Sequence, residues 1–397
     1  MKLKATTTYK NIKKAYDEDY RIVVAYGGSR SGKSYSILQI LITLMLSRKN
    51  LRITIWRNEK NTCRATIMED FKNILLSDTA LFNSFHENKS LGQFTNKKNG
   101  SKVSFEGGDN VGKVLGMTQD ISFFNEITEF SKDVYLQITQ RTGETIFCDY
   151  NPSKSFWLEK YRNKDDAKFV HSTYKDNSFV PKEIIKQLEG YNPNIRDNII
   201  NGTADNYLYQ VYCLGTKAEK PNKIYKNWNV MELVDFRELE YTSYFGLDFG
   251  EVSPTALIEV KFDGDDTFYV NQLIYKPENE MKSLVKELEQ INFNKSSLLI
   301  CDSKNRDKIR DLRYANYYAI GAKKGSGSVL DGISFINKMN VVYTRGSDDI
   351  EQEYESYSWE LDRYNKPTDE PLKRDDHLLD SFRYCASFLK TYLGIVR

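Results

Sequence analysis

Cysteine is scarce in this sequence and shows no metal-binding pattern. The 397 residues include five cysteines, which are scattered along the chain and never stand at C-x-x-C spacing. An odd number of scattered cysteines argues against a structural zinc site and favours a reducing compartment.

Long apolar runs and an excess of one charge are also lacking. The longest apolar run, residues 38–46, is too short to cross a bilayer, and the first five residues hold no apolar core of a signal peptide. The 57 Lys and Arg against 55 Asp and Glu leave a net charge of +2, with both signs interspersed. This balance excludes a strongly basic nucleic-acid coat protein but not a local basic channel. We expect a soluble cytoplasmic protein that is neither secreted nor bound to a membrane.

The length of the chain favours two domains. A chain of 397 residues, 40% of them hydrophobic, is longer than the chains that usually fold around a single hydrophobic core. Periodicity is lost over residues 207–228, where lysines, Gly215 and Pro221 occur. We expect a first domain over residues 1–210, a connector over 211–240 and a second domain over 241–397.

The strongest motif is the glycine-rich stretch at residues 27–34, which fits G-x-x-x-x-G-K-[ST] at every fixed position. A β-branched stretch precedes it and an apolar run of helical length follows it. Backbone N–H groups of such a loop point toward the phosphates. The positive amino-terminal end of the following helix also attracts the phosphates. We expect a bound nucleoside triphosphate, with Lys33 on the phosphate oxygens and Ser34 on Mg²⁺. The expected binding residues are Gly27, Gly28, Ser29, Arg30, Ser31, Gly32, Lys33 and Ser34.

Further elements of the first half predict a parallel sheet covered on both faces. Strands are expected at residues 51–57, 145–150 and 168–174, a helix at about 63–76, and a hairpin over 94–108 with Asn99 and Gly100 at its tip. The aromatic segment over residues 6–20 is either a surface helix or a packing surface for the base.

Two strand ends carry candidate catalytic residues. Residues 120–128 form an apolar strand that ends in Asn125 and Glu126, where a phosphate-loop ATPase keeps its second motif. Glu126 is the candidate base that polarises the attacking water. Asn125 stands in place of the usual aspartate and offers an oxygen without a charge. Asn151, in an Asn-Pro turn after another strand, either senses the γ-phosphate or belongs to a simple turn.

The second half carries separated carboxylates. A three-stranded antiparallel meander is predicted from residue 244 to 270, with Asp248 in its first strand. Asp302 ends a later strand, and a helix begins near Asp376. Carboxylates from such elements can converge on two divalent metals, for which hard oxygen ligands suit Mg²⁺ or Mn²⁺. His377 and Asp380, at i and i+3, share a face of that helix.

Taken in order, these motifs resemble the large subunit of a tailed-bacteriophage terminase. The resemblance rests on residues 27–34, 124–128, 151–153, 246–250, Asp302, 321–333 and 376–384. It implies an α/β protein with an amino-terminal RecA-like P-loop ATPase domain and a carboxy-terminal RNase H-like nuclease domain. The implied function is ATP-driven translocation of double-stranded DNA into a procapsid, with cutting of the concatemeric genome by a two-metal endonuclease.

The resemblance also assigns roles to residues. Lys33 and Ser34 bind phosphate and Mg²⁺, Glu126 is the catalytic glutamate, and Asn151 belongs to the coupling segment. The implied nuclease metal ligands are Asp248, Asp302 and Asp380, with His377 close by and Asp376 as the other candidate for the third acid. Lys324 is either a DNA-phosphate contact or a plain loop lysine. The arginine that reaches a neighbouring subunit is not assigned among Arg57, Arg64, Lys113 and Arg141. Residues 303–306 are more basic than the usual acidic turn.

The implied partners are double-stranded DNA, the phage portal protein, the small terminase subunit and further copies in a ring of about five subunits, acting in the host cytoplasm and transiently on the procapsid. Two other hypotheses remain. Residues 163–166 match the guanine-reading pattern N-K-x-D and would suit a GTP-gated switch with a non-catalytic second half. Alternatively, the nuclease is degenerate and only the ATPase works.

Overall fold

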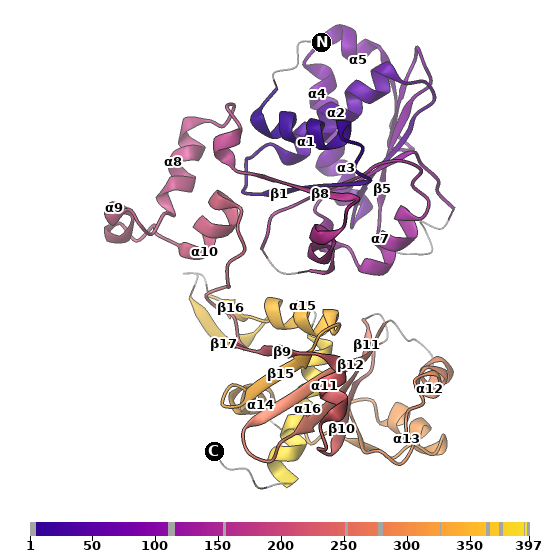
Figure 1. Cartoon of the computed structure of the whole chain (residues 1–397), viewed down its shortest axis with the longest axis vertical. Helices are drawn as coiled ribbons and strands as arrows, with labels where there is room; N and C mark the ends of the chain where they lie inside the picture. The colour runs from indigo at the N-terminus through magenta and orange to yellow at the C-terminus, as the bar shows by residue number, and fades with distance from the viewer. Residues whose placement is uncertain are drawn as a thin grey trace. The chain divides into compact units, whose positions relative to one another are not determined.

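The computed structural model describes residues 5–109, 116–153, 156–250, 253–276, 281–325, 327–362, 366–372, 376–392 and 394. The chain divides into two compact units, Met1–Ala218 and Glu219–Arg397 (Figure 1). The division falls within the range expected for the connector. The residues of that range nevertheless form elements of the units: the π-helix η4 (Tyr209–Leu214) in the first, and β9 (Asn229–Met231) and α11 (Leu233–Glu238) in the second.

The amino-terminal unit is built on an eight-stranded sheet of order β3-β4-β5-β2-β6-β7-β1-β8. In this spatial order, all neighbouring strands from β5 through β2, β6, β7 and β1 to β8 run parallel. The pairs β3–β4 and β4–β5 are antiparallel. The hairpin expected over residues 94–108 is therefore confirmed as β4 and β5. The strands are β1 (Ile22–Gly27), β2 (Arg52–Arg57), β3 (Phe85–Asn88), β4 (Gln93–Asn96), β5 (Lys102–Gly107), β6 (Ile121–Phe124), β7 (Ile146–Tyr150) and β8 (Ala167–Ser172).

Helices cover both faces of this sheet, as the apolar strands predict. Val23 and Ala25 of β1 belong to one core cluster, while Ile22 and Val24 belong to the cluster on the opposite face. The helices are α1 (Thr7–Asp17), α2 (Lys33–Ser47), α3 (Lys60–Ala65), α4 (Ile67–Leu76), α5 (Thr79–Asn83), α7 (Lys132–Thr139), α8 (Lys182–Gly190), α9 (Arg196–Ile200) and α10 (Asn206–Leu208), with the 3₁₀ segments η1 (Ile127–Glu129), η2 (Trp157–Asn163) and η3 (Tyr174–Asp176).

Two expectations in this unit are sharpened by the structure. The helix expected over residues 63–76 is two helices, α3 and α4, separated at Thr66. The aromatic segment after Thr6 forms helix α1, whose Ile12 is fully buried and whose Tyr16 ring stacks on Phe147 at 5.8 Å between centroids. Its rings therefore help to cover the sheet core.

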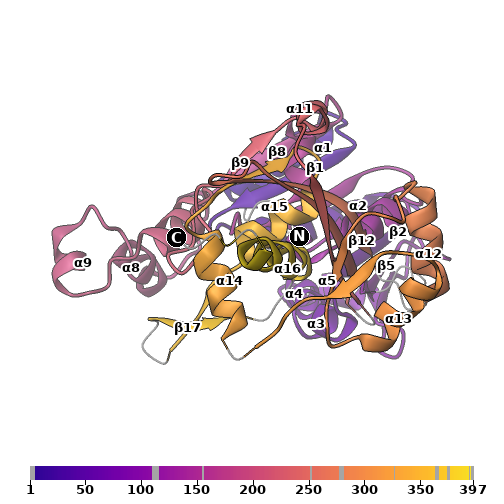
Figure 2. The same cartoon turned by 90° about the horizontal axis from the view of Figure 1, so that it is seen from below.

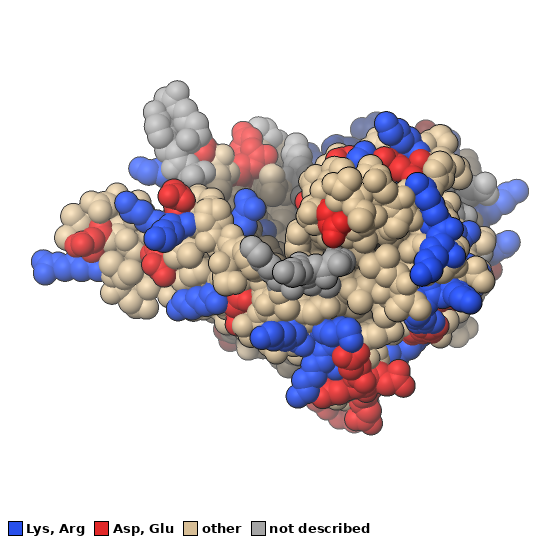
Figure 3. All heavy atoms as spheres, turned by 90° about the horizontal axis from the view of Figure 1, so that it is seen from above, with Lys and Arg blue, Asp and Glu red and all other residues tan. Residues whose placement is uncertain are grey.

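Charges of both signs are interspersed on the surface. Figure 3 shows one face on which Lys and Arg side chains alternate with Asp and Glu side chains and with uncharged residues. This distribution matches the small net charge of the sequence.

The carboxy-terminal unit is built on a seven-stranded mixed sheet of order β14-β13-β10-β11-β12-β15-β9. The expected meander is confirmed, because β10 and β12 both pair antiparallel with β11. A separate two-stranded sheet pairs β16 with β17. The remaining strands are β10 (Ser243–Asp248), β11 (Thr255–Phe262), β12 (Thr267–Lys276), β13 (Leu299–Cys301), β14 (Ala319–Gly321), β15 (Asn340–Thr344), β16 (Trp359–Leu361) and β17 (Pro367–Pro371).

Helices again lie on both faces (Figure 2). Leu257 of β11 packs with residues of α12 and α13, whereas Ala256 and Ile258 pack with residues of α14, α15 and α16. Gly246 lets α16 approach β10 closely, because a Cβ atom there would lie 2.1 Å from the carbonyl oxygen of Ser381. The helices are α12 (Met281–Gln290), α13 (Arg306–Tyr314), α14 (Ser328–Ile336), α15 (Asp348–Ser356) and α16 (His377–Tyr392).

Within the described ranges, every helix is too short or too polar to span a bilayer.

Candidate functional site

The first candidate site lies at the carboxyl edge of the amino-terminal sheet, where residues 27–34 join β1 to α2. Gly27 has φ +143°, and a Cβ atom on it would lie 1.8 Å from the carbonyl oxygen of Ser172, so only glycine fits. Gly32 begins α2 in the left-handed region, and no described side chain caps this helix. An uncapped helix start with free N–H donors is suited to an anion such as phosphate.

Lys33 is buried at the base of this loop and is held by oxygen atoms. Its ammonium group donates to the carbonyl oxygens of Gly28 and Gly27, at 2.8 and 3.2 Å, and to Oδ1 of Asn151 at 2.8 Å. The structure thus brings Asn151, from the turn after β7, to the lysine of the phosphate loop. Nδ2 of Asn151 also donates to the Ser29 hydroxyl at 3.4 Å.

Asp149 is the functional candidate that sequence reasoning missed. Its side chain accepts a hydrogen bond from the Ser34 hydroxyl, from Nδ2 of Asn125 at 3.0 and 3.1 Å, and from the backbone N–H of Glu126 at 2.7 Å. It is 1% exposed. The available signal was an ionisable residue inside the otherwise uncharged strand at residues 146–150, because a buried carboxylate requires partners.

Glu126 follows β6 in a strained backbone conformation. Its φ and ψ of 56° and 59° lie in the left-handed region, which is uncommon for a residue other than glycine. Burial raises the pKa of Glu126 to about 7, and the nearby charge of Asp149 adds to the rise. A carboxyl group with this pKa is suited to accept a proton near neutral pH.

Arg57 also reaches this edge from the end of β2. Its guanidinium donates to Oδ1 of Asn125 at 2.9 Å and to Glu129 at 3.1 Å. Two other cationic candidates lie elsewhere in the unit: Arg64 donates to the Ser90 carbonyl and Arg141 to the Gln137 carbonyl. Lys113 lies outside the described residues.

The second candidate site lies at the edge of the carboxy-terminal sheet where β10 and β13 end. These strands are parallel neighbours, and the backbone N–H of Asp302 donates to the carbonyl of Leu247 at 3.0 Å. Asp248 therefore ends β10, and Asp302 directly follows the adjacent strand β13. Both are largely buried, and burial raises the pKa of Asp248, with further contributions from Asp380 and Asp302.

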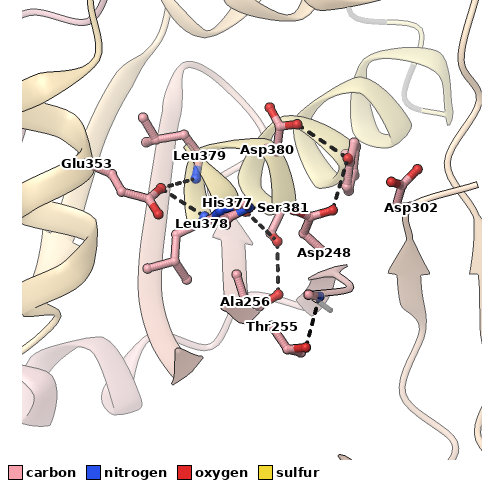
Figure 4. A network of polar contacts seen from close by, with 12 residues as sticks. Asp248, Thr255, Ala256, Asp302, Glu353, His377, Leu378, Leu379, Asp380 and Ser381 are labelled. Carbon is pink, nitrogen blue, oxygen red and sulfur yellow. Dashed lines mark hydrogen bonds and ion pairs between the residues drawn. The ribbon is translucent and has the colours of Figure 1, made fainter. Parts of the chain in front are cut away.

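Helix α16 brings the remaining candidates to this edge (Figure 4). Nδ1 of His377 lies 3.1 Å from Oδ2 of Asp248, and this contact raises the pKa of His377. Asp380 accepts from Arg383 at 2.6 Å. The hydroxyl of Tyr384 lies 3.5 Å from a carboxylate oxygen of Asp248 and of Asp380.

Lys324 completes this cluster. Its ammonium group donates to Asp302 and, at 3.1 Å, to the Tyr384 hydroxyl. This candidate for a DNA-phosphate contact thus pairs with a candidate metal ligand of its own chain. Asp376 interacts electrostatically with Asp380 and Asp248, and burial raises its pKa to about 6.

Among the described residues, no group of three or more His, Cys, Asp or Glu side chains is arranged closely enough to hold a metal ion. Tyr384 and Lys324 contact the carboxylates instead. The chemistry of the side chains suits hard divalent cations, because Asp248, Asp302 and Asp380 provide carboxylate oxygens, and both Asp380 and Asp302 raise the pKa of Asp248.

Glu353 is a second residue that sequence reasoning missed. Its carboxylate, 1% exposed on α15, accepts from the backbone N–H groups of Leu378 and Leu379 at 2.8 and 3.0 Å (Figure 4). It thereby caps α16 and fixes the position of His377 and Asp380. Helix capping from a separate helix leaves no local sequence signal.

The N-K-x-D match at residues 163–166 begins at the last residue of the 3₁₀ segment η2 and precedes β8. The pattern expected for guanine reading follows a strand, so this geometry does not support it.

Comparison with known proteins identifies the family. Residues 19–216 match the model described as phage terminase large subunit, and residues 248–387 match the model described as terminase RNAseH like domain. The chain is 21% identical over 411 residues to the PBSX phage terminase large subunit of Bacillus subtilis (strain 168), covering 93% of this chain and 90% of that one.

Two solved structures are also similar. The large terminase of a thermophilic bacteriophage, in complex with ATP-gamma-S, is 20% identical, with coverage of 96% and 98% and a TM-score of 0.46. The nuclease domain of g2p, the large terminase of bacteriophage SPP1, with bound Mn is 21% identical, with coverage of 40% and 95% and a TM-score of 0.37. The family models confirm the expected fold class and activities: the chain belongs to the phage terminase large subunit family, the DNA-packaging enzymes that join an ATPase domain to an RNase H-like nuclease domain.

Proposed function

We propose that the two candidate sites are the ATPase and nuclease centres of this terminase. The observation that carries the proposal is that, in each unit, residues from separate motifs converge on the carboxyl edge of one sheet. Lys33, Glu126 and Asn151 meet at the first edge, and at the second edge Asp302 and Asp380 lie close enough to Asp248 to raise its pKa. Ligands of open α/β sheets bind at such edges.

In the proposed ATPase centre, residues 27–34 and the start of α2 bind the triphosphate. Lys33 neutralises phosphate oxygens, and Glu126 accepts the proton of the attacking water. Mg²⁺ held at Ser34 would stabilise the charge that develops on the phosphates. Asn151, which contacts Lys33, relays the loss of the γ-phosphate to the DNA-gripping parts of the motor.

In the proposed nuclease centre, Asp248, Asp302 and Asp380 would hold divalent metal, with Asp376 as the other candidate for the third acid. His377 orients Asp248 through their contact at 3.1 Å. Mg²⁺ or Mn²⁺, two ions in the full site, would activate water and stabilise the leaving oxygen of the DNA backbone. Because phosphate contacts carry no base code, cutting is expected to be independent of sequence.

The proposal extends to partners. Double-stranded DNA is the substrate, the portal protein and the small terminase subunit are the docking partners, and further copies form a ring of about five subunits in the host cytoplasm. Membership of the terminase family supports this assignment. DNA-stimulated ATP turnover by the full chain would test it, and an absence of stimulation by any duplex DNA would contradict it.

One experiment on each centre tests the catalytic roles. Glu126→Ala should bind ATP and turn it over much more slowly, whereas Glu69→Ala, an exposed glutamate of α4, should match the wild type. Unchanged turnover by Glu126→Ala would show that another residue is the base. Preference for GTP over ATP would contradict the motor assignment.

For the nuclease, supercoiled plasmid with Mn²⁺ should be nicked by the wild type and by Asp369→Ala, an exposed control in the same unit, but not by Asp248→Ala. If the wild type does not nick, the nuclease is degenerate. If Asp248→Ala nicks at the wild-type rate, the metal site lies elsewhere.

A further inference from the structure

The second motif of the ATPase centre lacks the carboxylate that usually accompanies the metal ion. Its first polar residue is the neutral Asn125, and the orientation of this amide is fixed by its neighbours. Oδ1 accepts from Arg57, whose guanidinium can only donate, so Nδ2 faces Ser34 and Asp149. The amide nitrogen therefore points toward the Ser34 hydroxyl, and a nitrogen donor cannot bind a cation.

A carboxylate is nevertheless present at this position, on the adjacent strand. β6 and β7 run parallel, and Phe124 pairs with Cys148. Asn125 and Asp149 are consequently the next residues along two neighbouring strands. Asp149 accepts the Ser34 hydroxyl hydrogen bond and two contacts from Asn125.

Asp149 also reaches the candidate base. It accepts the backbone N–H of Glu126 at 2.7 Å, and this is the residue held in the left-handed conformation. One buried carboxylate thus joins the hydroxyl of the phosphate loop to the backbone of the second motif. A residue of this kind can position both the cation and the base.

We propose that Asp149 provides the carboxylate for the Mg²⁺ ion of the nucleotide, in place of the position occupied by Asn125. This assignment rests on the proposed ATPase function and adds a residue of β7 to its metal-binding side. Asn125 then has a different role, because it holds Asp149 through its amide nitrogen and Arg57 through its oxygen.

The test exchanges the two side chains. The full chain is titrated with Mg²⁺ in the presence of a fluorescent ADP analogue, and the nucleotide affinity in EDTA is measured separately. Asp149→Asn should require about 10- to 100-fold more Mg²⁺, as expected for loss of a group that supports a metal site, while the affinity in EDTA is kept. The double variant Asp149→Asn with Asn125→Asp returns a carboxylate to the site and should restore most of the Mg²⁺ dependence. Asp120→Asn is the matched control, because Asp120 lies just before the amino-terminal end of β6, whereas Asn125 follows the carboxyl end of that strand.

The outcomes separate this inference from the proposed function. Wild-type Mg²⁺ dependence in Asp149→Asn overturns the role of Asp149 but leaves the ATPase assignment intact. A double variant that melts like the wild type without recovering Mg²⁺ binding also overturns it. Nucleotide binding by the wild type that does not respond to Mg²⁺ would overturn both.

A measurement on the wild type covers the case in which Asp149→Asn does not fold. Fe²⁺ replaces Mg²⁺ with ADP, and oxidative cleavage by ascorbate and peroxide marks the backbone around the bound ion. Cuts at both Ser34 and Asp149 are expected. Cleavage at Ser34 without cleavage at Asp149 would contradict the proposal.

Discussion

Replacing Glu126 with glutamine should stabilise the protein without nucleotide while slowing its turnover. The reason is the buried carboxyl group, whose pKa is raised by burial and by Asp149 from 4.5 to about 7. Between these two pKa values, therefore, the carboxyl group is protonated in the folded state and ionised in the unfolded state. Wild-type stability must fall as the pH rises through this range, and the glutamine variant lacks that loss.

The size of the effect follows from the shift in pKa. At about 1.4 kcal/mol for each pKa unit, the ionised carboxylate opposes folding by about 3 kcal/mol at pH 8 and by about 1 kcal/mol at pH 5.5. Glutamine has nearly the same shape, and the backbone N–H of residue 126 can still donate to Asp149. Glu126→Gln should thus gain about 2 kcal/mol more at the higher pH.

Scanning calorimetry of the full chain in EDTA measures this gain. At pH 8 the transition of the amino-terminal unit should rise by roughly 6–10 °C in the variant, and at pH 5.5 by only a few degrees. Glu69→Gln, which changes an exposed glutamate, should shift neither transition. An equal rise of the transition at both pH values, or no rise at pH 8, would refute the assignment of Glu126 as a buried carboxyl group with a raised pKa.

Three further predictions concern residues that hold the two sites. Lys33→Ala should reduce nucleotide affinity by more than about tenfold in a fluorescence titration, because a buried charge on the phosphates is lost; unchanged affinity would contradict the proposed binding mode. Glu353→Ala leaves two buried N–H groups of α16 unpaired and should lower the stability of the carboxy-terminal unit by about 2–3 kcal/mol in urea unfolding, with slower plasmid nicking, while Glu353→Gln should recover much of both. Gly246→Ala should push α16 away from β10, since its Cβ would lie 2.1 Å from the Ser381 carbonyl, and should slow nicking while ATP turnover is kept; normal nicking would show that the approach of α16 is not needed.

Much of the fold could be predicted because its signals are local. The phosphate loop, the parallel strands of the amino-terminal unit and the meander from β10 to β12 each follow from residues adjacent in sequence. Periodicity places these elements without knowledge of the rest of the chain. The break at Thr66 between α3 and α4 was missed, since no proline or glycine marks it.

The sequence selects candidate residues for both sites but not the contacts that these residues make. Sequence motifs selected Lys33, Glu126, Asp248 and Asp302 as chemical groups, and the sheets bring them to two edges. The partners that fix them come from distant segments: Asp149 lies 115 residues from Ser34, and Glu353 is 25 residues from Leu378. Such pairings depend on strand order and helix packing, which no local pattern records.

The sequence by itself therefore predicts a nucleoside triphosphate site and metal-binding acids, because glycines, a lysine and carboxylates at fixed spacings have few other uses. The tertiary structure alone decided which carboxylate contacts the phosphate-loop serine and that Glu353 caps α16. The parallel pairing of β6 and β7 places Asp149 beside Asn125, and the close packing of α16 on β10 brings His377 to Asp248. Both results come from long-range packing, in which a buried charge must find its partners wherever the fold supplies them.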